Sequence, residues 1–209
     1  MAGAVNAVGF LGAHHQALSH MSGTGTIFST EIALGEFSSA IHAGLVIAWF
    51  FLGCVLSGMI IRQSTLKAGR RYGVALTCES ILLFAAAYFL RHGSNTGDYL
   101  AAMACGLQNA MATSYSGAVV RTTHITGIIT DLGIAVGLAV RREPVDRHRV
   151  KLFTLLVSGF LVGGVLGGWG FLHFGSDTLL FPAVTTGIAG VSYAIFKHRE
   201  RRLHHPLAK

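Results

Sequence analysis

Long apolar runs separated by short polar segments dominate the pattern of hydrophobic and polar positions along the chain. The clearest runs span residues 41–61, 73–90, 150–172 and 179–196. Each reaches the roughly 18 residues that a helix needs to cross the ~30 Å hydrocarbon core of a bilayer. A helix buried in a soluble protein would instead show polar residues at every third or fourth position. The pattern therefore predicts an all-α integral membrane protein.

Composition supports this interpretation. Of the 209 residues, 52% are hydrophobic and 12% are charged, whereas soluble domains carry roughly 25% charged residues. Cys54, Cys78 and Cys105 fall in apolar segments without CxxC spacing, so we interpret them as buried, inert thiols. No Lys/Arg-rich stretch precedes the first apolar segment, and we expect no cleavable signal peptide.

Positive charges concentrate in three short segments, 62–71, 141–151 and 197–202. Because the cytoplasmic loops of membrane proteins carry an excess of Lys and Arg, all three segments are expected on the cytoplasmic side. The net charge of +7 is therefore interpreted as a sign of membrane topology, and no nucleic-acid partner is expected. The same rule predicts about six net spans, a bacterial inner-membrane location and both termini in the cytoplasm.

Two further stretches, 2–35 and 99–140, each hold two apolar pieces around a polar centre that contains glycine. The second stretch must begin outside and end inside, before the basic segment 141–151. A single crossing made by an interrupted helix satisfies this condition, whereas two full crossings would violate it. The first stretch runs in the opposite direction and is longer than one crossing requires, which leaves room for a re-entrant piece.

The two interrupted stretches resemble each other in sequence. The Asn-Ala pair at residues 6–7 recurs at 109–110, and the segment HMSG at 20–23 matches HITG at 124–127. Each interrupted stretch is followed by two continuous apolar runs. This repetition, together with the charge pattern, indicates an internal repeat whose two copies cross the membrane in opposite directions.

We accordingly interpret residues 1–209 as one membrane domain made of two inverted-topology repeats, 1–97 and 98–209. Each repeat opens with an interrupted helix. Inverted repeats of this kind are typical of secondary transporters, in which the broken helices meet near the bilayer midplane and form the binding site.

The segment GLQNAMATSYSGAVVRTTHITG at 106–127, with the Asn-Ala pair and the Ser-Gly break of the first half, resembles the YoaK-like family of bacterial multi-span membrane proteins. That family is known mainly as a domain of unknown function. The resemblance implies a membrane location and about six spans, and it brings no established substrate. In the family the first break usually reads Thr-Gly-Asn, whereas here it is Ser22-Gly23-Thr24.

The breaks supply the candidate substrate-binding residues. A broken helix inside a membrane leaves backbone groups that need partners, and a helix that begins near the midplane presents a partial positive charge to an anion or a polarised carbonyl. An alternative interpretation is that the hydroxyl groups only cap the helices and bind nothing. The candidate substrate-binding residues are Asn6, His20, Ser22, Gly23, Thr24, Gln108, Asn109, Thr123, His124, Thr126 and Gly127.

Candidates for proton coupling are the ionisable residues within or beside the apolar segments. Glu79 lies inside the run 73–90, and Asp131 follows the second break. Charged side chains are expensive within a bilayer and are often functional there. Asp131 could instead stabilise the first turns of its own helix. His20 and His124 are either titrating groups in the cavity or hydrogen-bonded packing residues.

These features favour a membrane transporter or permease for a small polar solute, with an anion among the candidates, and a site between the two broken helices. The alternatives are a membrane-embedded enzyme or cofactor-binding protein that uses His and acidic residues, and a scaffold or regulatory subunit without a substrate. Enzymatic activity is the less favoured class. No HxxxH or Cys/His spacing indicates a metal or haem site, so no metal and no cofactor are expected.

The expected partners are the lipid bilayer and a small-molecule or ion substrate. Gly159, Gly163 and Gly167 recur at four-residue spacing and give the run 150–172 a smooth face. Such faces allow helices to approach closely, either within the bundle or across a homodimer interface.

Overall fold

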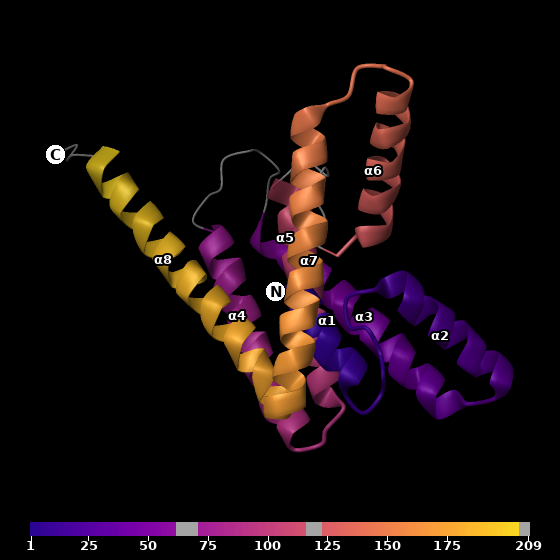
Figure 1. Ribbon diagram of the computed structural model, residues 1–209. Helices are drawn as coiled ribbons and strands as arrows, with labels where there is room; N and C mark the ends of the chain where they lie inside the picture. Colours follow the sequence, from indigo (N-terminus) through magenta and orange to yellow (C-terminus); the bar gives the residue numbers. More distant parts are fainter. Residues whose placement is uncertain (62–70, 116–122, 205–209) are drawn as a thin grey trace.

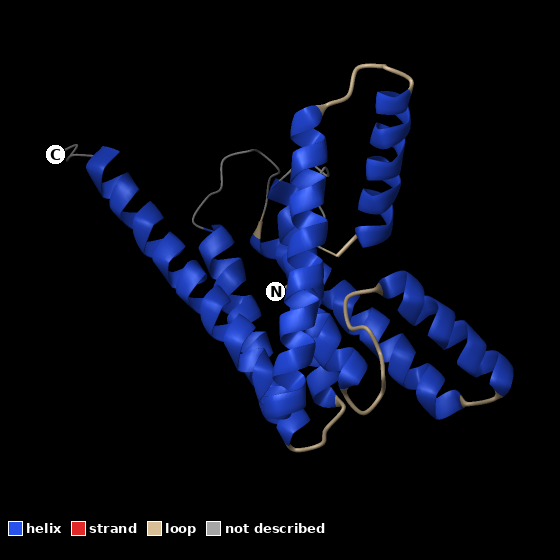
Figure 2. Ribbon diagram, viewed as in Figure 1, coloured by secondary structure: helices blue, strands red, loops and turns tan. Residues whose placement is uncertain are grey.

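The computed structural model describes residues 1–61, 71–115 and 123–204, although the side chains of Tyr115 and of residues 197–204 are not described. All regular structure in these residues is helical (Figure 2), in agreement with the predicted all-α class. The elements of the first half are α1 Ala2–Leu11, α2 Met21–Leu34, α3 Phe37–Ile60 and α4 Arg71–Arg91 (Figure 1). Those of the second half are α5 Thr96–Tyr115, α6 Ile125–Val140, α7 Arg147–Phe174, the 3₁₀ helix η1 Gly175–Leu179 and α8 Leu180–His204.

The core of the molecule lies where α5 packs against α3 and α4, and α4 packs in turn against α8. Helix α1 packs against α7. The two shorter helices α2 and α6 each lie against one long helix, α2 on α3 and α6 on α7. Helices α7 and α8 meet at η1 and diverge from there, so that they form a V in Figure 1. Gly175 makes the sharp turn with a φ of +57°, a conformation that glycine adopts without a side-chain clash.

Glycines allow the closest helix crossings. A Cβ atom on Gly106 of α5 would overlap the carbonyl oxygen of Phe50 on α3, and a Cβ on Gly3 of α1 would overlap that of Phe160 on α7. The α4–α8 crossing is similar, since a Cβ on Gly73 would lie 2.8 Å from the Gly190 oxygen. Small residues at crossings let backbones approach in the way that membrane helix bundles use.

The predicted smooth face of α7 is partly occupied by α1. A Cβ atom on Gly167 would lie 2.5 Å from the Cα of Ala4, and one on Gly163 would lie 3.6 Å from the Ala4 nitrogen. Around Gly159 no atom lies within 4 Å of the added Cβ position among the described residues. The face therefore takes part in packing within the chain, and a homodimer across it stays a prediction.

Three apolar helical segments are long enough to cross a bilayer: Phe37–Ile60, Arg71–Arg91 and Arg147–Phe196. The last has 50 residues and includes α7, η1 and most of α8. Large apolar side chains cover their outer surfaces, as at Phe51, Leu172 and Phe181, and such a surface would be unfavourable in water. These segments indicate a membrane protein. The four long apolar runs of the sequence lie on α3, α4, α7 and α8.

Both remaining stretches are interrupted, but the interruption precedes the expected motif in each case. In the first half, residues 12–20 separate α1 from α2, and Ser22, Gly23 and Thr24 already belong to α2. In the second half, Thr126 and Gly127 belong to α6, while Thr123 lies just before it. Thr122 lies outside the described residues. The serine, threonine and glycine motifs thus form the first helical turns after the interruptions, which corrects their predicted place within the breaks.

Candidate functional site

His20 and His124, which the sequence matches between the two halves, occupy the same local position in the structure. His20 is the N-cap residue of α2, with φ −102° and ψ 73°, and His124 is the N-cap of α6, with φ −89° and ψ 56°. His20 is half-buried and His124 is exposed. The similarity in sequence therefore corresponds to a similarity in local backbone structure.

The glycine three residues after each histidine leaves room for its imidazole ring. A Cβ atom on Gly23 would lie 2.8 Å from Cδ2 of His20, and a Cβ on Gly127 would overlap the ring of His124. Each imidazole thus folds back over the first turn of the helix that it precedes. The requirement for this space explains why a His-x-x-Gly pattern occurs in both halves.

The hydroxyl groups of these turns satisfy nearby backbone carbonyls. The buried Thr24 Oγ1 donates to Ala17 O at 3.1 Å and to His20 O at 3.3 Å. Thr26 Oγ1 donates to Ser22 O at 3.0 Å, and the hydroxyl of Thr130 donates to Thr126 O at 3.0 Å. These contacts are local, as in the alternative that the sequence left open, but the hydroxyl groups donate to carbonyl oxygens and neither N-cap residue makes a side-chain cap hydrogen bond.

The two helix starts are not brought into one cavity in the described part of the chain. Helix α2 packs on α3 and α6 packs on α7, and no comparable contact joins α2 to α6. Ser22 and Thr126 are exposed, while Thr123 is buried. The candidate binding residues are thus divided between separate places, and a substrate role for them stays a prediction.

The matched asparagines differ in their surroundings. Asn6 Oδ1 accepts hydrogen bonds from Ser19 N at 2.9 Å and from Ser19 Oγ at 3.0 Å, and so ties the segment 12–20 to α1. Asn109 Oδ1 is buried and has no hydrogen-bond partner among the described atoms. Asn6 therefore has a bracing role, whereas the Asn109 oxygen is available to a further donor.

Glu79 and Gln108 are brought together, although 29 residues separate them. Gln108 Nε2 on α5 donates a hydrogen bond of 2.8 Å to Glu79 Oε1 on α4. Glu79 is only 2% exposed, and its second oxygen, Oε2, has no hydrogen-bond partner within the described structure. An ionised carboxylate in such surroundings needs a proton or a cation as a partner, because one hydrogen bond does not replace its lost hydration.

Gln108 also lines a cavity of about 380 Å³. The walls come from both halves of the chain, namely the start of α1, the second half of α5 and the first half of α7. Besides Gln108, the lining residues are Met1, Ala2, Gly3, Met111, Ala112, Leu155, Leu156, Gly159 and Phe160. The glutamine is therefore the polar link between an apolar cavity and the buried carboxyl group of Glu79.

Asp131 lies in the second turn of α6 and not in its first turn. Its Oδ2 accepts a hydrogen bond of 3.0 Å from Nη2 of Arg149 on α7, and both side chains are well exposed. The contact is a surface ion pair that joins α6 to α7, and such pairs contribute little to stability. The position does not support stabilisation of the first helical turns, and a role of Asp131 in proton coupling stays a prediction.

A second polar cluster, formed by His14, His42 and Asp98, was not found by sequence reasoning. His14 and Asp98 are 84 residues apart in the sequence, and the three residues follow no known metal-ligand spacing. The available signal was that His42 and Asp98 stand near the ends of two apolar segments predicted to meet the same membrane face.

Comparison with known families gives one match. A family model described as "Protein of unknown function (DUF1275)" matches residues 1–192. The match confirms the resemblance seen in the sequence and covers both halves of the chain. No curated protein and no solved structure matches the chain.

Proposed function

We propose that this chain, which belongs to the DUF1275 family of proteins of unknown function, is a multi-pass membrane transporter or permease for a small polar solute. The main observation behind this proposal is that the buried carboxyl group of Glu79 accepts a hydrogen bond from Gln108, which lines a cavity between the two halves. Ionisable residues within membrane segments commonly mark ion or substrate pathways. Gln108 can exchange its hydrogen bond with Glu79 for one with a solute in the cavity. Glu79 is the proposed proton-coupling group.

Pairwise helix packing supports the proposal of two related repeats within a six-span arrangement. In the proposed repeats each helix of the first half has a counterpart in the second half: α5 for α1, α6 for α2, α7 for α3 and α8 for α4. Exchanging counterparts converts the α1–α7 contact into the α5–α3 contact. It also converts α2–α3 into α6–α7 and leaves α4–α8 unchanged. The Gly3–Phe160 and Gly106–Phe50 crossings follow the same exchange. The large α4–α5 contact has no equally extensive α8–α1 counterpart among the described residues, so the symmetry is approximate.

The predicted anion preference rests on a different feature, the helix starts at His20 and His124. Each presents the positive end of a helix dipole and backbone N–H groups. Because the described structure keeps these helix starts apart, the proposed site is centred on Glu79 and Gln108. The proposed substrate class is therefore a small hydrogen-bonding solute, and anions are among the solutes to be tested.

The test uses the purified full-length chain reconstituted into liposomes that contain a pH-sensitive dye. Gradients of small carboxylates, amides, polyols and amino acids are imposed in turn, and movement of solute and of protons is recorded. We expect flux of one solute class with accompanying proton movement, and loss of the proton movement in Glu79→Gln. Glu143→Gln is the matched control, since Glu143 forms an exposed ion pair with Arg141.

Two results would contradict the proposal. Proton movement in Glu79→Gln equal to that of the wild type would exclude Glu79 as the coupling group. Absence of flux for every solute class, with the wild type shown to be folded and correctly reconstituted, would exclude transport of small polar solutes and favour the scaffold alternative.

A membrane-embedded enzyme or cofactor-binding protein is the second candidate function. The observation that favours it is the cluster of His14, His42 and Asp98, which gathers polar side chains at one end of the helix bundle. Equilibrium ligand binding at this cluster in a protein without solute flux would distinguish this function from transport.

A further inference from the structure

We propose that His14, His42 and Asp98 form a binding site for a divalent transition-metal ion of the zinc type, at the end of the bundle where α3 and α5 begin. The three side chains come from three separate elements: the segment 12–20 between α1 and α2, the second turn of α3, and the first turn of α5. The site is independent of the proposed transport function. It departs from the sequence-based expectation of no metal.

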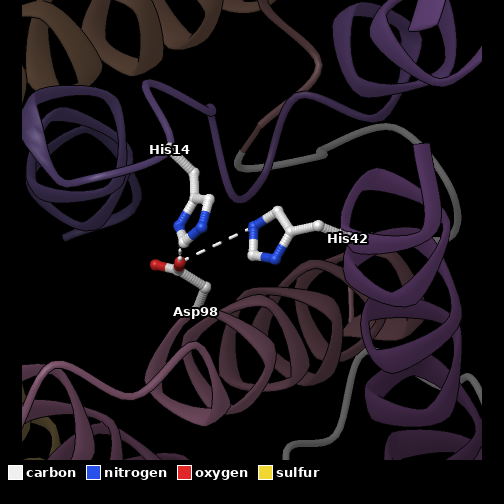
Figure 3. A group of neighbouring side chains, drawn as sticks. All are labelled: His14, His42 and Asp98. Carbon is white, nitrogen blue, oxygen red and sulfur yellow. Dashed lines mark hydrogen bonds and ion pairs between the residues drawn. The ribbon is translucent and has the colours of Figure 1, made fainter. Parts of the chain in front are cut away.

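The three potential ligand atoms converge on one place. His14 Nδ1 lies 3.2 Å from Asp98 Oδ2, and His42 Nε2 lies 3.6 Å from the same oxygen. All three ligand atoms lie within 4.8 Å of one another. Figure 3 shows the two imidazole rings side by side, and dashed lines join a nitrogen of each ring to the Asp98 carboxylate.

These separations fit a metal centre. Zinc binds His nitrogen and carboxylate oxygen at about 2.0–2.1 Å in tetrahedral geometry, which places neighbouring ligand atoms roughly 3.3 Å apart. The separations of 3.2 Å and 3.6 Å from Asp98 Oδ2 lie on either side of that value. Entry of a cation requires the stacked rings of His14 and His42 to turn so that one nitrogen of each points at the ion.

His42 carries the strongest indication of a missing partner. The residue is only 6% exposed, and its Nε2 is buried without a hydrogen-bond partner in the described part of the protein. Its other ring nitrogen, Nδ1, lies 3.1 Å from the Tyr99 hydroxyl. Metal-binding histidines typically hold one ring nitrogen in such a contact while the other binds the ion.

One of the two neutral tautomers of His42 leads to the same conclusion. With Nδ1–H donating to Tyr99 Oη, Nε2 presents a lone pair to the Asp98 oxygen, and two acceptors then face each other. A cation between them removes that repulsion. A shared proton is the competing occupant, and the experiment below is designed to distinguish the two.

His14 provides access from solution. Its side chain is 33% exposed, and its ring stacks on that of His42 with centroids 4.0 Å apart and planes at 21°. The exposed side leaves a coordination position open for water or for a fourth ligand. With three protein ligands, the arrangement has the open character of catalytic or exchangeable zinc sites and not the closed character of structural ones.

The donor set defines the metal class. Two imidazole nitrogens and one carboxylate oxygen suit Zn²⁺, Co²⁺, Ni²⁺ or Fe²⁺, whereas Mg²⁺ and Ca²⁺ prefer oxygen donors alone. Asp98 precedes Gln108 by ten residues on α5, which is about 15 Å along the helix axis. An ion bound here would join the segment 12–20 to the starts of α3 and α5, apart from the Glu79–Gln108 pair.

The test measures binding of Zn²⁺ to the full-length, chelator-treated protein in detergent, purified with a tag that lacks histidine. Competition against a chromophoric chelator gives stoichiometry and affinity. We expect one ion per chain and a loss of more than ~100-fold in affinity for His42→Gln and Asp98→Asn, with a loss of about 10–100-fold for Tyr99→Phe. His92→Gln on an exposed residue and Asp177→Asn on a half-buried one are matched controls outside the cluster and should bind as the wild type does.

A spectroscopic measurement on the wild type keeps the proposal falsifiable where a variant fails to fold. X-ray absorption of the Co²⁺- or Zn²⁺-loaded protein should show two imidazoles and one carboxylate oxygen around the metal. Absence of imidazole scattering would overturn the proposal. Equal Zn²⁺ affinity in the wild type, His42→Gln and Asp98→Asn would do so too.

Discussion

Replacing Gln108 by leucine is expected to destabilise the protein because it removes the hydrogen-bond donor of a buried carboxyl group. The bond from Gln108 Nε2 to Glu79 Oε1 is 2.8 Å long. Glu79 Oε2 already has no partner among the described atoms, so the substitution leaves both carboxyl oxygens without a donor there. An unsatisfied buried polar group costs about 1–3 kcal/mol, which sets the expected loss. Leucine has a comparable volume, so the packing contribution is small.

A double-mutant cycle separates this interaction from general effects of the substitution. Glu79→Leu alone should leave the Gln108 amide unsatisfied, while the combined Glu79→Leu and Gln108→Leu variant removes both partners. Replacing both by apolar groups of similar shape is close to neutral. The double variant is therefore expected to be more stable than the sum of the single effects predicts, with a coupling of about 0.5–3 kcal/mol.

Gln16→Leu is the matched control. Gln16 is 3% exposed, and its Nε2 is buried without a hydrogen-bond partner in the described structure. Its replacement removes an amide group that already lacks a partner there, so it should not destabilise the protein. Free energies of unfolding are measured by titrating the detergent-solubilised protein with a denaturing detergent and following helical circular dichroism. A Gln108→Leu effect as small as that of Gln16→Leu, or the absence of coupling in the cycle, would refute the reasoning.

Three further substitutions test the packing and capping of the helices. Gly106→Ala should destabilise the α3–α5 crossing by about 1–3 kcal/mol in the same unfolding titration, whereas Gly58→Ala, where the added Cβ meets no described atom within 4 Å, should not. Gly127→Ala should displace the imidazole of the preceding N-cap residue and shift its NMR signals, while Gly133→Ala, with similarly open space, should leave them unchanged. Asp146→Ala should cost about 0.5–2 kcal/mol, because the Asp146 side chain accepts hydrogen bonds from two backbone N–H groups at the start of α7. An unchanged stability in Gly106→Ala or in Asp146→Ala, or an unshifted histidine signal in Gly127→Ala, would contradict the corresponding contact.

The long apolar helices could be predicted from the sequence because hydrophobic length alone determines them. The runs on α3, α4, α7 and α8 need no knowledge of neighbouring segments. The motif after each interruption was harder to place, since serine and threonine occur both in breaks and within helices. In a helix their hydroxyl groups bond the carbonyl three or four residues earlier. Thr26 and Thr130 do so here, and the polar turns that contain them are helical.

Contacts between distant segments could not be predicted in the same way. Glu79 and Gln108 were each singled out, but their pairing depends on how α4 and α5 are rotated about their axes. A single sequence does not determine this rotation. The cluster of His14, His42 and Asp98 depends in addition on the path of residues 12–20, which Asn6 ties to α1 through Ser19. The path of this segment cannot be predicted from its local composition.

The residues that the two halves share and the residues that form polar clusters belong to different sets. The matched His-x-x-Gly segments form the starts of α2 and α6, and the matched glycines permit helix crossings. Gln108, by contrast, corresponds to Val5 in the alignment that pairs Asn6 with Asn109, and Val5 is a buried core residue.

His42 departs from the repeat in the same way. Phe50 and Phe160 are equivalent in the two helix crossings, and an alignment that pairs them makes His42 correspond to Leu152 of the second half. A repeat that is maintained for packing constrains both copies, whereas a site that binds one solute or one ion needs its polar groups only once. Candidate functional residues in this fold are therefore better sought where the second half departs from the first, and Gln108 and His42 are two such positions.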